Sequence, residues 1–171
     1  MPDCKRLKRD FYTRDVLEVA PALLSKILAI AKPDGTISRY YVTETEAYRG
    51  SEDLACHACK GRTPRTEVMF QKGGLIYVYL VYGIHWMFNV VTGKVNEPQA
   101  VLIRSLKGCT GPGRLTKISG IDGSFYGEDL VSSERIWFED STLTPVIKTG
   151  ERIGIDYAGD YWKRKPWRFY I

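Results

Sequence analysis

The chain has 171 residues, of which 44% are hydrophobic and 26% are charged, and its 25 Lys and Arg against 20 Asp and Glu give a net charge of +5. This composition is typical of a folded globular protein and excludes extensive disorder. No apolar run reaches the roughly 18 residues of a membrane-spanning helix, and the charged N-terminus is followed by no apolar stretch of a secretory signal, so we expect an intracellular protein.

The N-terminal third predicts a short helix followed by two strands. Residues 15–24 begin with an Asp in the position of an N-cap, and Pro21 keeps this helix short or kinks it. Residues 26–31 and 37–48 have the composition of strands, and the turn Lys-Pro-Asp-Gly at residues 32–35 joins them. The sequence therefore predicts a helix that precedes a β-hairpin.

Residues 50–74 are polar and are expected to form a loop with one helical turn. The spacing of Cys56 and Cys59 in this loop is that of half a zinc site or of a redox pair. A structural zinc site needs four ligands, usually from two close pairs, and the other cysteines, Cys4 and Cys109, stand singly in the chain. No βαβ pattern surrounds the pair. We therefore expect neither a metal site nor a redox function.

The remainder of the chain is rich in short strands. Residues 75–82 and 84–91 are β-branched and aromatic, and Gly83 between them favours a hairpin. Residues 100–106 form a further apolar strand, and a Gly-Pro-Gly motif at 111–113 precedes a short helix that ends near Gly120. The last strands are expected at residues 135–139, 145–148, 151–155 and 167–171.

Strands outnumber helices in this prediction, and the connections between them are too short for βαβ crossovers. The sequence therefore predicts an α+β fold over residues 1–171. We expect a single compact domain with a mainly antiparallel curved β-sheet, peripheral helices and a protruding β-hairpin.

The segment YVTETEAY at residues 41–48 carries two carboxylates. The strand period of two places Val42, Glu44, Glu46 and Tyr48 on one face. Such a face either meets solvent or forms the floor of a cleft in which a carboxylate acts as a general base. Periodicity does not choose between Glu44 and Glu46.

The segment GLIYVYLVYG at residues 74–83 places Tyr77 and Tyr79 on one face and its aliphatic residues on the other. This pattern is typical of a core strand with tyrosines at its rim. Tyr82 stands directly before the turn at Gly83, where a bulky aromatic residue is exposed. A side chain in that position is suited to act as a wedge between base steps of DNA.

Residues 162–168 combine four cations with two tryptophans. Cations interleaved with aromatic residues suit contact with phosphates. A solvated, charged strand or loop is an equally open interpretation of the same segment.

The motifs resemble those of a known family in order and spacing. They are ETEAY at residues 44–48, Gly50, Glu52-Asp53, His57, TPR at 63–65, MF at 69–70, YVYLVYG at 77–83, Asn89, Arg104, GPG at 111–113 and RFY at 168–170. From about Val16 to Ile171 the chain is similar to the 3-methyladenine (alkyladenine) DNA glycosylases.

This resemblance implies a DNA repair enzyme that flips an alkylated or deaminated purine out of duplex DNA and hydrolyses its N-glycosidic bond. Glu46 corresponds to the general base that activates water, and Arg104 to the arginine that helps to position the carboxylate and the water. Alkylation turns the purine into a good leaving group, so the chemistry requires no metal, nucleotide cofactor or Schiff-base lysine. We expect a monofunctional glycosylase that leaves an abasic site.

The resemblance also implies the residues of a base pocket. Tyr48, His57 and Tyr79 correspond to residues that stack on and hydrogen-bond to the flipped base, and Asn89 corresponds to a residue of the pocket floor that helps to reject guanine. Tyr82 corresponds to the residue that intercalates into the minor groove. The expected partner is damaged double-stranded DNA, bound by a monomer without membrane contact.

Other interpretations stay open at the level of sequence. His57 is also typical of a hydrogen-bonded loop residue, Arg104 of a partner for a carboxylate, and Asn89 of a strand-edge residue that binds backbone groups. A non-catalytic nucleic-acid-binding module and a hydrolase of free nucleosides are the two alternative functions. Methylated adenine, methylated guanine, hypoxanthine and etheno-adenine all remain candidate lesions.

Overall fold

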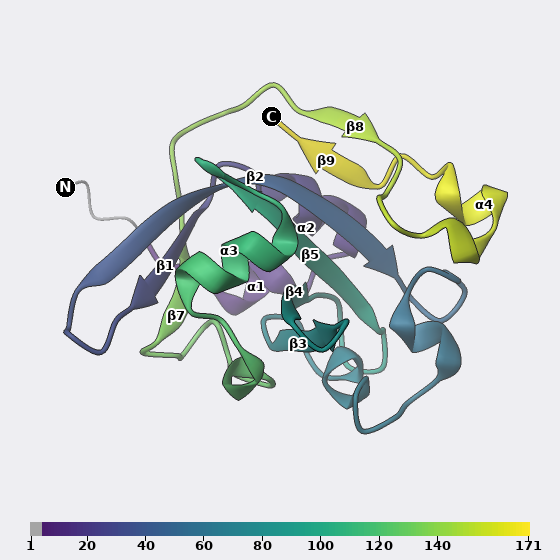
Figure 1. Ribbon diagram of the computed structural model, residues 1–171, viewed down its shortest axis with the longest axis horizontal. Coiled ribbons are helices and arrows are strands. Elements are labelled where there is room, and N and C mark those ends of the chain that lie inside the picture. Colours follow the sequence, from purple (N-terminus) through teal and green to yellow (C-terminus); the bar gives the residue numbers. More distant parts are fainter. Residues whose placement is uncertain (1–4) are drawn as a thin grey trace.

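One β-sheet of nine strands organises residues 5–171, the part of the chain that this computed structural model describes. Six strands lie side by side in the order β3-β4-β5-β2-β1-β7, and each neighbouring pair is antiparallel. Strand β9 also pairs with β2 and carries β8 at its outer side, and the short β6 pairs with β5 (Figure 1). The predicted α+β class with a mainly antiparallel sheet is confirmed.

The elements are short apart from strand β2. The strands are β1 (Ile27–Ala31), β2 (Ile37–Arg49), β3 (Ile76–Val81), β4 (His85–Val91), β5 (Gln99–Leu106), β6 (Cys109–Thr110), β7 (Ile136–Glu139), β8 (Lys148–Gly150) and β9 (Arg168–Tyr170). The α-helices are α1 (Arg9–Tyr12), α2 (Val16–Ala22), α3 (Pro112–Ser119) and α4 (Asp160–Lys163). The 3-10 helices are η1 (His57–Lys60), η2 (Glu67–Phe70), η3 (Gly123–Phe125) and η4 (Asp156–Ala158). Within residues 5–171 no helix has both the length and the apolar character that crossing a bilayer requires.

Both predicted helices are confirmed, together with their boundary signals. The carboxylate of Asp15 caps α2 by accepting a backbone N–H, and Pro21 lies in the last turn of this helix. Helix α3 begins at Pro112 and ends at Ser119, and the next residue, Gly120, caps it in a left-handed conformation. The single-turn helices α1 and α4 were not predicted, because four residues are too few to show helical periodicity. The predicted loop at residues 50–74 contains two 3-10 helices, where one turn was expected.

The predictions for residues 145–155 are wrong in part. Only Lys148–Gly150 forms a strand in the region predicted to begin at residue 145, and residues 151–155 form a loop. In this loop the N–H of Ile153 donates to the carboxylate of Glu46, and the carbonyl of Glu151 accepts Nε of Arg168, so both backbone groups bond to side chains and not to a neighbouring strand. In this segment Arg152 and Ile155 are buried, whereas the side chain of Ile153 is exposed.

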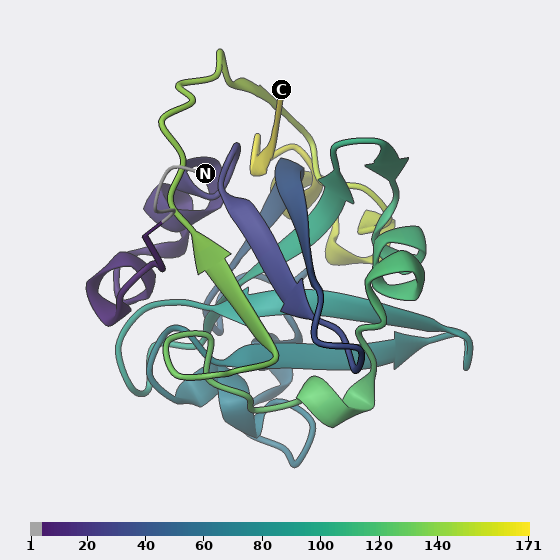
Figure 2. The same ribbon diagram turned by 90° about the vertical axis from the view of Figure 1, so that its left-hand side faces the viewer.

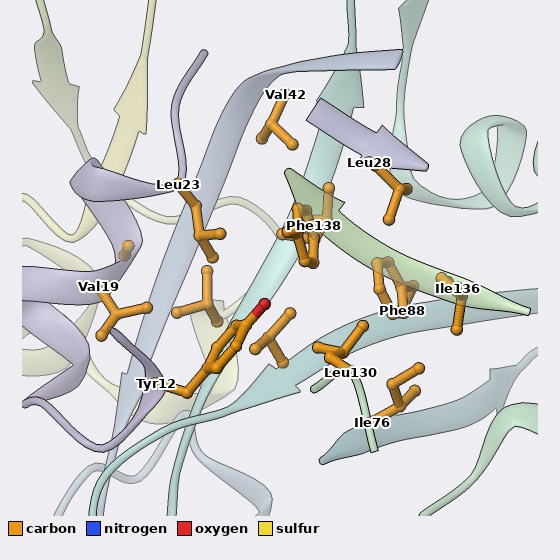
Figure 3. Packing of buried hydrophobic residues seen from close by; sticks show 14 of the residues in the cluster. Tyr12, Val19, Leu23, Leu28, Val42, Ile76, Phe88, Leu130, Ile136 and Phe138 are labelled. Atoms are coloured by element: carbon orange, nitrogen blue, oxygen red, sulfur yellow. The ribbon is translucent and has the colours of Figure 1, made fainter. Parts of the chain in front are cut away.

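The main hydrophobic core gathers side chains from α1, α2, α3 and strands β1 to β5 and β7 (Figure 3). Tyr12 and Leu23 enter this core from the helical side, and the rings of Phe88 and Phe138 stack with centroids 6.3 Å apart. Full burial of one such side chain contributes about 1.5–3 kcal/mol. This packing fixes one face of β2 and β3, so that their opposite faces are free to build a site.

Strand β2 contains a β-bulge that changes which residues face the core. Its pairing with β5 shifts register on both sides of Glu44. As a result, Val42 and Ala47 both lie in the main core, although strict alternation would place them on opposite faces. The prediction of one shared face is therefore wrong for Val42, whereas Glu46 and Tyr48 do lie side by side.

Strands β3 and β4 form the predicted hairpin, which projects beyond the rest of the molecule, as the teal strands of Figure 2 show. Val81 pairs with His85, so Tyr82, Gly83 and Ile84 form the turn. Tyr82 and Gly83 have φ angles of +52° and +70°. The Tyr82 side chain is 89% exposed and that of Ile84 is 71% exposed, which leaves two apolar side chains at the tip.

Candidate active site

A pocket of about 300 Å³ opens at the base of this hairpin, between strands β3, β4 and β5, the end of β2, and the loops around His57 and Ile153. Six of the seven residues predicted for the site line it: Tyr48, His57, Tyr79, Tyr82, Asn89 and Arg104. Pockets of this size hold small organic ligands. Glu46, the seventh, does not line the pocket and lies behind its wall.

One wall of the pocket is a cluster of aromatic rings. The centroids of Tyr77 and Tyr79 are 5.3 Å apart, and the ring of His57 meets that of Tyr79 edge-on at 4.6 Å. Nδ1 of His57 lies 2.8 Å from the hydroxyl of Tyr77. Burial, with a smaller contribution from the nearby cations of Arg65 and Lys60, lowers the pKa of His57 to about 4. The imidazole is therefore neutral at pH 7, and the wall offers rings without a positive charge on the histidine.

The carboxylate of Glu46 is fully buried and is held by three neighbours that line the pocket. Its Oε2 accepts the hydroxyl of Tyr48 at 2.8 Å, and its Oε1 accepts the backbone N–H of Ile153 at 2.7 Å. Nη1 of Arg104 lies 3.5 Å from Oε2. Burial raises the pKa of Glu46, and these three contacts oppose that rise.

Glu44 occupies a different environment from Glu46. Its Oε1 accepts Nη1 of Arg168 at 3.0 Å, and its Oε2 accepts the hydroxyl of Ser105 at 2.7 Å. Nε of Arg104 lies 3.5 Å from the same Oε1, so Arg104 bridges the two glutamates. The buried Nε of Arg104 has no hydrogen-bond acceptor among residues 5–171. The three partners of Glu46 all line the pocket, whereas of the partners of Glu44 named here only Arg104 does.

The floor and the mouth of the pocket hold the other predicted residues. The side-chain amide of Asn89 is buried and donates to the backbone carbonyls of Tyr77 at 3.1 Å and of Met87 at 3.3 Å. Tyr82 reaches the mouth from the hairpin turn while most of its ring stays in solvent. These contacts also agree with the alternative interpretation of Asn89 as a strand-edge residue that binds backbone groups.

Two features of the site were missed by sequence reasoning. Tyr157, in the 3-10 helix η4, lines the pocket, and its hydroxyl donates to the carbonyl of Ala55 at 3.2 Å. Asp53 and Arg152 form a fully buried ion pair beside the pocket, with Nη1 2.6 Å from Oδ2. Asp53 belonged to a recognised motif without a role, and Arg152 stood in a segment predicted as a strand. No local pattern in the sequence joins residues 99 positions apart.

The cations of residues 162–168 have protein partners. Nζ of Lys163 contacts Asp156, Nη2 of Arg164 lies 3.6 Å from Asp160, and Arg168 is directed toward Glu44. Nζ of Lys165 lies 4.1 Å from the ring centroid of Tyr161. Part of this basic segment therefore serves internal contacts, whereas Lys163, Arg164 and Lys165 stay at the surface.

The cysteines of the Cys-His-Ala-Cys motif do not form a site with other ligands. Cys56 is buried, which raises the pKa of its thiol to about 12, and the sulfur of Cys59 lies 3.9 Å from the carbonyl of Leu54. Within residues 5–171, no three His, Cys, Asp or Glu side chains are grouped closely enough to hold a metal ion. Cys4 lies outside the described residues.

The geometry thus combines an aromatic slot, a buried carboxylate behind its wall and an exposed ring at its mouth. Residues 10–171 match the sequence family described as methylpurine-DNA glycosylase. The chain is 43% identical to a protein of Desulfitobacterium hafniense, in an alignment covering 98% of this chain and 95% of the other. It is 40% identical to a protein of Psychrobacter cryohalolentis (90% and 86% covered) and 41% identical to one of Methanocella arvoryzae (96% and 91% covered). All three relatives are provisionally named 3-methyladenine DNA glycosylases.

Proposed function

Because the chain belongs to the methylpurine-DNA glycosylase family, we propose that it removes alkylated or deaminated purines from duplex DNA by base flipping and hydrolysis. The observation that carries this proposal is the position of Glu46. Its carboxylate lies behind the wall of an aromatic pocket, in contact with three lining residues, and an exposed Tyr82 stands at the mouth.

The pocket suits a planar base that carries a positive charge. Arg152 lies over one face of Tyr48 and Arg65 over one face of Tyr79. A cationic base over the other face of either ring gains about 0.5–2 kcal/mol from the ring quadrupole. The neutral His57 meets Tyr79 edge-on without repelling such a base. Because its Nδ1 contacts the hydroxyl of Tyr77, Nε2 is the ring nitrogen left for a hydrogen bond with the base. Asn89 at the floor is the residue that we propose to disfavour normal guanine.

The proposed reaction is a single hydrolytic displacement. Glu46, as the carboxylate, accepts a proton from water while the water oxygen bonds to C1′ of the deoxyribose. The C1′–N bond breaks at the same time, and its electron pair leaves with the purine, as in glycoside hydrolysis. An alkylated, positively charged purine thereby leaves as a neutral base, and a deaminated purine leaves as an anion that takes up a proton from water. Arg104 and Tyr48, which line the pocket, hold the carboxylate of Glu46, and in this proposal Arg104 also helps to position the water.

A monofunctional reaction fits the composition of the pocket. A lyase that cuts the DNA strand commonly uses an amine nucleophile to form a Schiff base. The described residues that line the pocket include no lysine. Water is therefore the proposed nucleophile, and the product is an abasic site in an intact strand.

The hairpin is proposed to open the duplex. Insertion of the Tyr82 ring into the minor groove offsets part of the stacking that is lost when the damaged nucleotide rotates out. Its exposed position at the hairpin tip, with Ile84 beside it, supports this function because neither side chain is used for internal packing.

The test is a base-release assay with purified protein on duplexes that contain methylated adenine, methylated guanine, hypoxanthine or etheno-adenine. We expect release of at least one of these bases, with the strand left uncut until the abasic site is cleaved by alkali. Tight binding without release would support the non-catalytic module instead. Hydrolysis of free nucleosides that is unaffected by Tyr82→Ser would support the nucleoside hydrolase.

A further inference from the structure

The ion pair of Asp53 and Arg152 is the most deeply buried charged contact beside the pocket. Both side chains have no exposed surface, and the contact is bidentate, with distances of 2.6 Å and 3.0 Å. The guanidinium of Arg152 also lies between two rings, 4.9 Å from the centroid of Tyr48 and 5.0 Å from that of Trp167. The planar group is therefore fixed in position and in orientation.

This pair connects four segments, of which strand β2 and the loops that follow Asp53 and Arg152 contribute residues to the pocket. Arg152 donates to the carbonyl of Ala47 at 3.0 Å on strand β2 and to that of Trp162 at 3.3 Å on α4. Asp53 accepts the backbone N–H groups of Arg49 and Ala55, both at 3.0 Å, and so fixes the loop that leads to His57. The Asp53–Arg152 contact thus holds both strand β2, which carries Glu46, and the loop that leads to His57.

The next residue after Arg152 provides the link to the chemistry. Ile153 lines the pocket, and its N–H donates to Oε1 of Glu46 at 2.7 Å. Arg152 also packs on the ring of Tyr48, whose hydroxyl donates to Oε2 of the same carboxylate. Two of the three groups that hold Glu46 are therefore positioned by Arg152.

We propose that the Asp53–Arg152 pair positions the carboxylate of Glu46 for base release, acting through the backbone of Ile153 and the ring of Tyr48. This inference rests on the function proposed above for Glu46. Asp53 and Arg152 touch no reacting atom in this scheme, so they are positioning residues.

The energetics of buried ion pairs indicate that the Asp53–Arg152 pair positions Glu46 and does not mainly stabilise the fold. Taking two charges out of water costs several kcal/mol for each ion, and apolar residues of similar volume often stabilise a protein as well as a buried pair does. A bidentate guanidinium–carboxylate contact, in contrast, fixes direction and register in a way that apolar packing does not. The pair lies beside Glu46, whose carboxylate must be correctly oriented to act as the proposed general base.

Disturbing the pair has a predictable effect on the titration of Glu46. The charged and titratable groups near this carboxylate are Glu44 and Tyr48 on β2, Arg104 on β5, Tyr79 on β3, Arg168 on β9, and Asp53 and Arg152 in the adjoining loops. The N–H of Ile153 lowers the pKa of Glu46. A displaced Ile153 therefore raises this pKa, provided that the charges around it are unchanged.

Arg152→Lys and Asp53→Glu meet that condition, because each keeps its charge. Arg152→Lys removes the fork of N–H donors, and Asp53→Glu displaces the carboxylate by one methylene group. Single-turnover base release from the best lesion duplex is measured between pH 4.5 and pH 8, together with the Kd for that duplex. We expect release at pH 7 to slow by about tenfold, the size of one lost hydrogen bond to a charged group. The acid limb of the rate should move to higher pH, and the Kd should change by less than about threefold.

Arg39→Lys is the matched control. Arg39 makes a bidentate contact with Glu139, at 2.9 Å and 3.0 Å, on the side of β2 that pairs with β1 and is remote from the pocket. This variant should keep the wild-type release rate and acid limb.

The outcomes separate the two proposals. An active wild-type protein whose folded Arg152→Lys and Asp53→Glu variants keep its rate and pH profile would overturn the positioning inference alone. Failure of both variants to fold would assign the pair to stability and would also overturn it. A wild-type protein that releases no base would overturn the proposed function, on which this inference rests.

Discussion

The two faces of strand β2 are buried by different means. The core face packs aliphatic and aromatic side chains, and its buried Thr45 hydroxyl donates to the carbonyl of Ala20 at 2.8 Å. The pocket face buries a carboxylate, Glu46, beside Arg104, and the Asp53–Arg152 pair lies just behind. One strand thus separates a layer that provides stability from a layer that holds charges.

The two faces therefore contribute differently to the free energy of unfolding. Removing atoms from the apolar face loses burial and leaves a cavity, so unfolding becomes easier. Removing the charge of Glu46 relieves an unfavourable burial, because the fold raises the pKa of this carboxyl. Substitutions on the first face should therefore reduce stability, and substitutions on the second face should reduce activity.

The largest loss of stability is expected for Phe138→Ala on β7, in the core cluster that also contains Val42 and Ala47 of β2. Phe138 is fully buried and stacks on Phe88, so its truncation should lower the free energy of unfolding by about 3–5 kcal/mol. Denaturant unfolding followed by fluorescence measures this change. Base release per folded molecule should stay near the wild-type value, and a loss of stability below about 1 kcal/mol would contradict the assignment of the core.

The pH dependence of base release tests whether the buried carboxylate of Glu46, on the pocket face of β2, must be ionised for activity. The proposed base must be ionised, and burial raises the pKa of Glu46 above its usual value of 4.5. In single-turnover assays, the rate of base release should therefore begin to fall at a pH above 4.5. Below that point it should drop about tenfold for each pH unit. A rate that stays constant down to pH 4.5 would contradict this account.

The titration of Glu46 should also change the stability of the fold, which should decrease as pH rises through the pKa of this carboxyl in the folded state. The raised pKa favours the protonated carboxyl in the folded state, so this contribution is present below pH 4.5 and is lost as pH rises through the folded pKa. Glu46→Gln should consequently gain thermal stability relative to the wild type as pH rises from 4 to 8. A constant difference across that range would show that the group does not titrate as inferred.

Tyr82→Ser tests the exposed hairpin, which belongs to neither buried face. Loss of one stacked ring should weaken binding to lesion duplex by about 1–3 kcal/mol and affect hydrolysis in the bound complex less. Val146→Ser is a control, because Val146 is an exposed apolar residue in the connection between β7 and β8. Equal binding by wild type and Tyr82→Ser would contradict the proposed wedge.

The smallest effect is expected for Lys165→Ala in the basic segment. If Lys165 contacts a phosphate, its removal should weaken binding to damaged and undamaged duplexes equally and reduce the slope of log affinity against log salt by about one. An unchanged slope would favour the alternative interpretation of this segment as a solvated surface.

Much of the fold could be predicted because its signals are local. The N-cap Asp15, the Gly-Pro-Gly motif before α3 and the Gly83 turn each mark an element over a few residues. The bulge around Glu44 could not be predicted, because one extra residue changes pairing without changing composition.

The candidate site was predictable to a similar extent. Six of its residues were expected from the sequence motifs and line one pocket. The Asp53–Arg152 pair escaped prediction because its partners lie 99 residues apart, and Arg152 resembles any polar residue of a short strand. Only the tertiary arrangement brings Ile153 to Glu46, so the burial of this carboxylate behind the wall was also not foreseen.

The most direct test compares Glu46→Gln with Glu44→Gln in single-turnover base release and in binding to the same lesion duplex. The two glutamates lie two residues apart and share Arg104, so they are matched in position and charge. We predict that Glu46→Gln loses at least about a hundredfold in release and keeps its affinity, whereas Glu44→Gln is much milder. Substantial turnover by Glu46→Gln, or equal losses in both variants, would contradict the assignment of Glu46 as the base.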